Sequence, residues 1–184
     1  MSVFVALSTV LGFAVIDHRV LVGPGVDTGD FVRFGLQLPC VLIMLLATSE
    51  RLYARWYQPA IQIVAPLFGI GTVLLVVQSV QVQMPLVGSR LVLAAFFFYF
   101  MIGLSFYAAL RSNLVMAGAY GAAALIGAIP QDIATYQLFV LVCANVIGAA
   151  GAYALEHANR TAFLDRRRLA EVAMHDGLTG LLNR

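Results

Sequence analysis

The chain has 184 residues, of which 61% are hydrophobic and only 11% charged, and its formal net charge is +2. A soluble globular domain carries roughly 25% charged residues, so the composition excludes that class and indicates an integral membrane protein. We expect the lipid bilayer to be its surroundings and no nucleic acid among its partners.

Six hydrophobic segments follow one another along the chain. They cover residues 1–16, 31–49, 59–83, 89–110, 112–129 and 133–155. Crossing a bilayer takes about 20 apolar residues in a helix, and residues 91–110 and 133–155 meet this length without a single charge. The sequence therefore predicts an all-α fold, a polytopic bundle of six transmembrane helices over residues 1–155, with Pro39 and Pro66 kinking the second and third.

The arginines predict how this bundle is oriented. The chain has no lysine, and six spans would put both of its ends on one side of the membrane. That side would also hold a loop at 50–58 and a short turn at Arg111. It would carry eight of the eleven arginines: Arg51, Arg55, Arg111, Arg160, Arg166, Arg167, Arg168 and Arg184. Because cytoplasmic loops are enriched in basic residues, we expect both termini in the cytoplasm.

Small residues recur at helical spacing in two segments. The last span has Ala144, Gly148 and Ala152, and the fifth has a series that includes Gly118 and Ala122. Faces of this kind let helices approach closely. Packing inside one bundle is the favoured interpretation, and an interface between subunits is the alternative.

Polar groups within the spans are few, which argues against several functions. The centres of spans three to six contain no ionisable residue, whereas a proton- or ion-coupled transporter would need one. The three histidines do not form a pair that could hold haem. We expect no metal site. A bundle that senses an apolar or amphipathic small molecule remains, with Arg33, Gln78 and Asn145 as candidate ligand-binding residues. For Asn145, a hydrogen bond between helices without any ligand is the simpler interpretation.

The composition changes at Glu156, and residues 156–174 are predicted to continue the last span as a cytoplasmic signalling helix. This stretch has no proline or glycine. Residues at alternating spacings of three and four form the seam of a short coiled coil: Leu155, Ala158, Ala162, Asp165, Leu169 and Val172. Asp165 places a charge where an apolar residue belongs. A solvated helix or one lying on the lipid surface is the alternative.

The last ten residues, 175–184, have a different pattern. Asp176-Gly177 signals the end of a helix, and Thr179 can cap a new one. Seven residues here match the pattern D-x-L-T-G-L-x-N-R: Asp176, Leu178, Thr179, Gly180, Leu181, Asn183 and Arg184. This pattern resembles the opening of the GGDEF domain of bacterial diguanylate cyclases, and the preceding helix is similar to the stalk that feeds such domains.

The resemblance implies a function for the longer protein. A GGDEF domain makes cyclic di-GMP from two GTP molecules, held on two facing domains, so a homodimer, GTP and Mg are expected. Its catalytic residues would follow Arg184, so we expect none in this chain. We therefore predict a sensor and dimerisation domain of a diguanylate cyclase in the bacterial inner membrane, which relays ligand binding through the stalk. The alternatives are a passive membrane anchor without a ligand and an independent small-molecule transporter.

Overall fold

The computed structural model describes residues 2–20, 25–81, 88–100 and 104–173. Within these ranges every regular element is a helix, which confirms the all-α prediction. In chain order the elements are α1 (Ser2–Val20), α2 (Gly25–Val32), η1 (Arg33–Gln37), α3 (Leu38–Ala47), α4 (Glu50–Gln81), α5 (Ser89–Phe100), α6 (Phe106–Leu125) and α7 (Gln131–Ala173).

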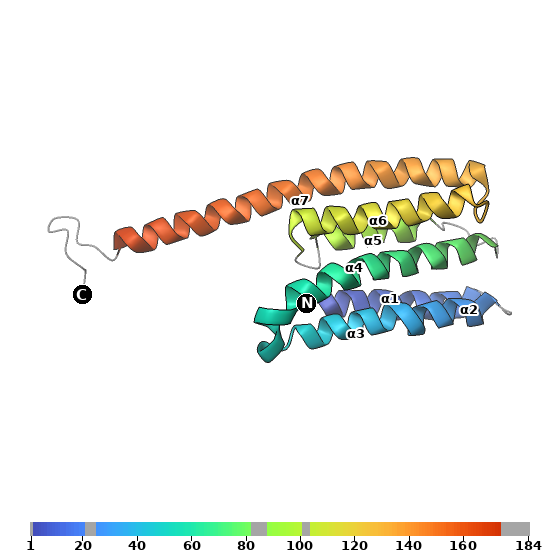
Figure 1. The fold of residues 1–184 in the computed structure, drawn as a ribbon, viewed down its shortest axis with the longest axis horizontal. Helices are drawn as coiled ribbons and strands as arrows, with labels where there is room; N and C mark the ends of the chain where they lie inside the picture. The colour runs from blue at the N-terminus through green and yellow to red at the C-terminus, as the bar shows by residue number, and fades with distance from the viewer. Residues whose placement is uncertain (1, 21–24, 82–87, 101–103, 174–184) are drawn as a thin grey trace.

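These elements lie side by side as rods (Figure 1). The first rod is α1, and α2, η1 and α3 follow without a break as a second. Helices α4, α5, α6 and α7 supply the others. Helix α1 begins at the end of the bundle from which α7 extends (Figure 1).

The second rod contains a wider helical turn just before a proline. Residues 33–37 form a π-helix, and Pro39 occupies the first turn of α3. A proline ring clashes with the carbonyl four residues earlier, here that of Gly35, and removes one hydrogen bond. A π-turn changes the spacing of the helical backbone hydrogen bonds at that point, so the chain continues as a helix through the proline. The irregular turn also carries Arg33 and Gln37, two buried polar residues.

Among the residues that the structure describes, three helical stretches are long and apolar enough to cross a membrane, namely Gly29–Ala47, Arg55–Gln81 and Gln131–Glu171. The described parts of α1 and α5 contain shorter apolar stretches. Helix α7 has 43 residues, or about 65 Å at 1.5 Å per residue, whereas the hydrocarbon core of a bilayer is about 30 Å thick. The helix is therefore about twice as long as one crossing requires.

The core runs through the bundle and includes buried residues of α1 and of α3 to α7. Helix α4 packs on α3 and α6, and α7 packs on α5 and α6. Large side chains fill the spaces between them, including Ile61, Phe98, Met116 and Tyr120, each no more than 1% exposed. Phe98 also makes an edge-on contact with Phe68, with ring centroids 6.3 Å apart, a geometry that aromatic rings favour.

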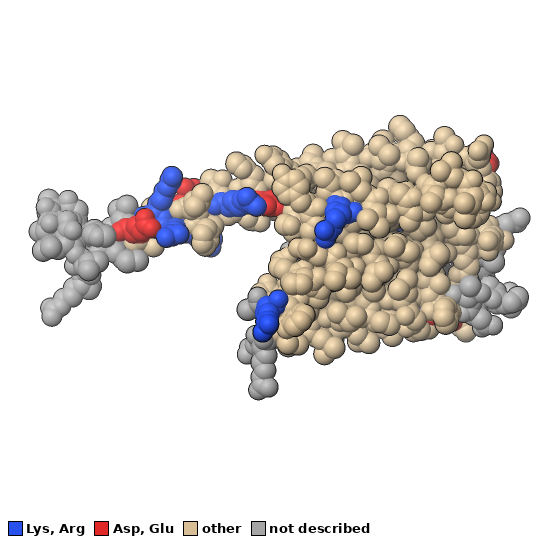
Figure 2. Space-filling view, in the orientation of Figure 1, with Lys and Arg blue, Asp and Glu red and all other residues tan. Residues whose placement is uncertain are grey.

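The outside of the bundle is apolar. Figure 2 shows few charged side chains on this face of the bundle, whereas most of the charged side chains in view lie on the projecting part of α7. Many large apolar residues are exposed, such as Leu46, Ile63, Phe139 and Ile147, all about two-thirds accessible. Soluble monomers rarely expose continuous apolar surface on this scale, so the surface agrees with the membrane association that the composition indicates.

The turn between the fourth and fifth segments is displaced from its predicted position. We expected a turn at Arg111, but α6 begins at Phe106 and Arg111 lies inside it. Ser105 has an extended backbone, with φ −63° and ψ 152°, as the residue before a helix commonly does. The charge of Arg111 does not mark a boundary between helices. Its side chain instead donates to the Gln62 carbonyl of α4 at 3.3 Å.

Candidate functional site

A cavity of about 310 Å³ lies between α1, the η1 turn, α4 and α5. This volume falls at the lower end of the range of small-molecule pockets, about 300–1,000 Å³. Its walls are mostly apolar and aromatic: Val10, Phe13, Phe68, Leu75, Leu93, Ala94, Phe96, Phe97 and Phe100. Leu93 and Phe100 are also partly exposed on the outside of the bundle, so the cavity reaches the apolar surface.

Polar side chains from four elements gather on the cavity wall. Thr9 comes from α1, Arg33 and Gln37 from η1, Thr72 from α4 and Arg90 from the first turn of α5. Gln37 Nε2 donates to Thr72 Oγ1 at 3.2 Å, and the Thr72 hydroxyl in turn donates to the Phe68 carbonyl at 3.0 Å. The polar wall is therefore held by hydrogen bonds that join the second rod to α4.

The two arginines are held by neighbouring side chains. Arg33 is only 2% exposed and pairs with Asp30 at 3.1 Å. Arg90 donates from Nη1 to the Ser79 hydroxyl at 3.0 Å, and its guanidinium lies 5.2 Å from the centre of the Phe13 ring, a cation–π distance. These contacts fix Arg90 against both α1 and α4.

The same two arginines concentrate positive charge beside an apolar space. Both line the same cavity. Buried charges are costly unless they are paired, and Arg33 is paired with Asp30.

The aromatic run of residues 96–100 divides its side chains between the cavity and the core. Phe96, Phe97 and Phe100 line the cavity. Phe98 is fully buried against α4 and α6, and Tyr99 faces α7. Five consecutive residues cover every face of a helix, so one helix presents these rings to several neighbours. The division shows that α5 contacts the cavity on one face and α7 on another.

Of the three predicted ligand-binding residues, the structure brings only Arg33 to the cavity. Gln78 packs against α2, where a Cβ on Gly29 would lie 2.8 Å from its Oε1. Asn145 lies on the α5–α7 contact, where its Oδ1 accepts from the Tyr99 hydroxyl at 3.1 Å and its Nδ2 donates to the Leu141 carbonyl at 2.8 Å. Asn145 is thus placed to join two helices, the simpler of its two interpretations.

Sequence reasoning missed Arg90 and Thr72. For Arg90, an arginine shortly before the aromatic run of residues 96–100 was a usable signal. Thr72 gave no signal, since a threonine inside an apolar helix usually bonds its own backbone. Asn113 was also missed. It is fully buried, and its Nδ2 donates to the carbonyls of Ala95 and Ala109 at 3.4 and 3.2 Å, which ties α6 to α5.

The contact between α5 and α7 is close because of a small-residue face on α7. Ala144, Gly148 and Ala152 are buried, and a Cβ on Gly148 would lie 2.4 Å from Tyr99 Cδ2. This series therefore packs inside the bundle, the favoured interpretation. The other series faces outward, because a Cβ on Gly118 would meet nothing within 4 Å and Ala122 is exposed.

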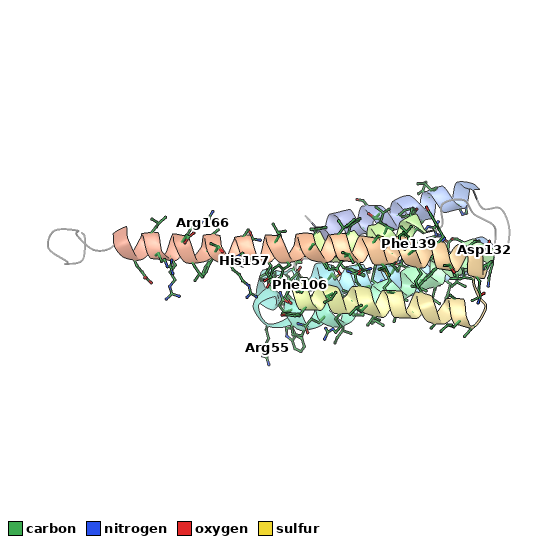
Figure 3. All side chains as sticks on the ribbon, turned by 90° about the horizontal axis from the view of Figure 1, so that it is seen from above. Arg55, Phe106, Asp132, Phe139, His157 and Arg166 are labelled. Carbon is green, nitrogen blue, oxygen red and sulfur yellow. The ribbon has the colours of Figure 1, made fainter. Side chains whose placement is uncertain are left out.

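Glu156 fastens α7 to the bundle at the point where the helix leaves it. Its Oε2 accepts from the backbone N–H of Phe106, the first residue of α6, at 2.6 Å, while its Oε1 pairs with Arg160. A carboxylate is favourable at a helix N-terminus, which carries partial positive charge. Figure 3 shows Phe106 beside this part of α7, with Arg55 at the same end of the bundle and Asp132 at the other.

Beyond Glu156, α7 projects from the bundle as a single exposed helix (Figure 1). The predicted seam has no partner within the described chain: Leu155 is 49% and Leu169 is 69% exposed, and Ala158, Ala162 and Asp165 are exposed too. The continuous helix agrees with the sequence prediction, whereas pairing of the seam stays a prediction. The side chain of Val172 and the motif residues 176–184 lie outside the described part of the structure.

Within the described ranges no group of three or more His, Cys, Asp or Glu residues could hold a metal ion. The two cysteines are free, with Cys40 buried and Cys143 partly buried. Comparison with protein-family models, with curated proteins and with solved structures finds no match to this chain.

Proposed function

We propose that this chain is the membrane sensor and dimerisation region of a diguanylate cyclase. In this proposal, ligand binding in the bundle is relayed through α7 to a GGDEF domain that follows Arg184 and makes cyclic di-GMP from two GTP molecules with Mg. The motif at residues 176–184 is the reason for proposing a GGDEF domain. The bundle and its long helix provide the route by which a signal would reach that domain.

The observation that carries the proposal is the continuity of α7. One unbroken helix packs against α5 inside the bundle and then projects beyond it. Helix α5 in turn lines the cavity with Arg90, Phe96 and Phe97. A ligand that displaces α5 therefore acts on Tyr99 and Gly148, where α5 meets α7, and a rigid helix transmits such a shift along its axis.

The relay is a shift between two populations of dimer. A ligand changes an equilibrium only by its difference in affinity for the two states. Two ways of pairing the stalk helices of a dimer, with similar stability, would meet this requirement. Asp165 weakens the coiled-coil seam, so that neither pairing is strongly favoured. The contact of Glu156 with the start of α6 is a point where the bundle can hold or release the stalk.

The proposed membrane arrangement uses the six rods as six spans. Both chain ends lie on the cytoplasmic side, with the stalk arginines and Arg55, and Asp132 lies on the outer side. The positive-inside rule supports this orientation.

A change in stalk phase tests the relay. Inserting one residue after Asp165 in the longer protein rotates the following helix by about 100°, and we expect cyclic di-GMP production to change several-fold. Inserting seven residues at the same place restores the seam to within about 20° and is the matched control, which should preserve both the activity and its regulation. Cyclic di-GMP is measured in membranes that contain equal amounts of each protein.

The alternatives give different results. Equal activity for both insertions would indicate a tether, as a passive anchor requires. A coding sequence that shows no GGDEF signature within one domain length after Arg184 would remove the cyclase from the proposal and leave an independent membrane protein, such as a transporter.

A further inference from the structure

The two arginines on the cavity wall already have partners inside the protein. Arg33 pairs with Asp30 at 3.1 Å, and Arg90 donates to the Ser79 hydroxyl at 3.0 Å. A ligand of this cavity therefore need not carry a charge. The rest of the lining is mostly apolar, and five of its side chains are phenylalanines: Phe13, Phe68, Phe96, Phe97 and Phe100.

Gln37 presents a hydrogen-bond acceptor to this space. The single proton of the Thr72 hydroxyl goes to the Phe68 carbonyl, so Thr72 Oγ1 can only accept, and it accepts from Gln37 Nε2 at 3.2 Å. Oε1 of the same amide therefore faces away from Thr72, and no described side chain donates a hydrogen bond to it. This oxygen is not fully enclosed by protein atoms either. It borders open space, and the cavity is the space that Gln37 lines.

The amide of Gln37 is fixed in position by its neighbours. The side chain is only 5% exposed, and its Cγ lies so near α4 that a Cβ on Gly71 would stand 3.2 Å from it. The bond to Thr72 holds the other end. A buried acceptor that lacks a donor is unfavourable, and one already held in place binds a donor without a further loss of side-chain freedom. The site therefore favours a ligand that carries a hydrogen-bond donor.

We propose that the cavity binds an uncharged ring compound with one hydroxyl group. The hydroxyl would donate to Gln37 Oε1, and the rings would lie among Phe96, Phe97 and Phe100. Burying a hydroxyl without a hydrogen bond is costly, so Gln37 is the residue that admits a polar group into a mainly apolar cavity. This inference names the ligand class of the proposed sensor and so rests on the proposed function.

The size and lining of the cavity favour rings over a lipid tail. An apolar cavity of about 150 Å³ holds one benzene molecule, so about 310 Å³ gives room for two fused rings. Aromatic rings pack favourably in offset or edge-on arrangements, and Phe96 and Phe100 already stack with centroids 6.1 Å apart. A lipid tail, about 15 Å long to fill half of the hydrocarbon core, has no donor for Gln37.

Entry of the ligand and its effect both involve α5. Leu93 and Phe100 line the cavity and also reach the outside of the bundle, so a compound dissolved in the membrane can enter sideways, beside α5. Rings among the phenylalanines act on one face of α5, and Tyr99 on another face bonds Asn145 of α7. Binding thus reaches the helix of the proposed relay.

The test uses 2-naphthol as the probe and the 184-residue chain in bilayer discs of a zwitterionic lipid. The comparison ligand is 2-fluoronaphthalene, which has the same rings and a substituent of similar size but no O–H. Binding is measured as the ligand retained per chain above that of empty discs, at equal concentrations of each ligand in the lipid. We expect one molecule of 2-naphthol per chain and about twofold to tenfold weaker binding of 2-fluoronaphthalene, because a hydrogen bond between neutral groups contributes about 0.5–1.5 kcal/mol.

Three variants locate the site. Gln37→Leu removes the acceptor and should lower the affinity for 2-naphthol to that for 2-fluoronaphthalene, whose own binding should not change. Gln62→Leu is the matched control, because it makes the same change outside the cavity lining and should leave both affinities as they are. Ala94→Phe fills the cavity and should abolish the binding of both ligands. The comparison of the two ligands on the unchanged chain decides the question even if Gln37→Leu does not fold.

Four results would overturn the inference: no binding of 2-naphthol, equal affinity of the unchanged chain for both ligands, binding that survives Ala94→Phe, and a lipid tail found in the cavity of the purified protein. Failure here and failure of the proposed function are distinguishable. If 2-naphthol does not bind but the one-residue stalk insertion changes cyclic di-GMP output, the sensor stands and this ligand class is wrong. If 2-naphthol binds as described but the two insertions behave alike, the site stands and the relay is wrong.

Discussion

Gly148 shows how one missing side chain sets the distance between two helices. Tyr99 of α5 lies over its Cα, so close that an added Cβ would stand 2.4 Å from the ring. The same tyrosine donates a hydrogen bond to Asn145, three residues earlier in α7. A glycine, a tyrosine and an asparagine therefore form one contact between α5 and α7.

We predict that Gly148→Ala destabilises the bundle by about 1–3 kcal/mol, the usual cost of overpacking a close contact. The new methyl group must displace the Tyr99 ring and disturb its bond to Asn145. The matched control is Gly118→Ala, because a Cβ there meets nothing within 4 Å, and alanine favours a helix by up to about 1 kcal/mol. Unfolding midpoints in detergent compare the two variants, and equal midpoints would contradict the packing described.

At the scale of the element, α7 is one helix in two environments. Its first part buries Leu141, Ala144 and Ala152 against the bundle, whereas its projecting part exposes Phe163, Leu164 and Leu169 to more than half of their area. Exposed apolar residues on an isolated helix favour a partner. A second copy of the same helix is the partner that the proposed dimer supplies.

We predict that Asp165→Leu strengthens dimerisation of the 184-residue chain about tenfold or more. The change completes the apolar seam, and burial of a leucine contributes about 1.5–3 kcal/mol. Arg166→Leu adds the same side chain one position off the seam and is the control. Dimer fractions come from cross-linking across a dilution series in discs. The two variants would dimerise equally if the stalk did not pair through this seam.

At the scale of the whole molecule, the distribution of charge gives the bundle two unlike ends. Arg55 and the projecting part of α7 lie at one end, and Asp132 lies at the other (Figure 3). Arg19, Arg33 and Arg90 are the three exceptions to the arginine pattern, and two of them, Arg33 and Arg90, line the cavity.

We predict that a cysteine at position 166 is cytoplasmic and one at position 132 is external. The chain is first changed to Cys40→Ala and Cys143→Ala, and Arg166→Cys or Asp132→Cys is then added. A membrane-impermeant maleimide should label the Asp132→Cys protein in intact cells, and the Arg166→Cys protein only after lysis. The reverse pattern would contradict the proposed orientation.

The sequence alone determined the helical class and the unbroken helix through Glu156, because hydropathy and helix propensity act over short stretches of chain. It also singled out Arg33 and the small residues of α7. The loop predicted at residues 50–58 is wrong, since α4 already begins at Glu50. The sequence also misplaced the turn at Arg111, since a single charge does not reveal whether it lies in a loop or reaches a neighbouring carbonyl. Only the tertiary structure decided which polar residues share a cavity. Arg33, Thr72 and Arg90 lie on three different elements, and their proximity depends on how those helices pack, a property that no local pattern in the chain carries.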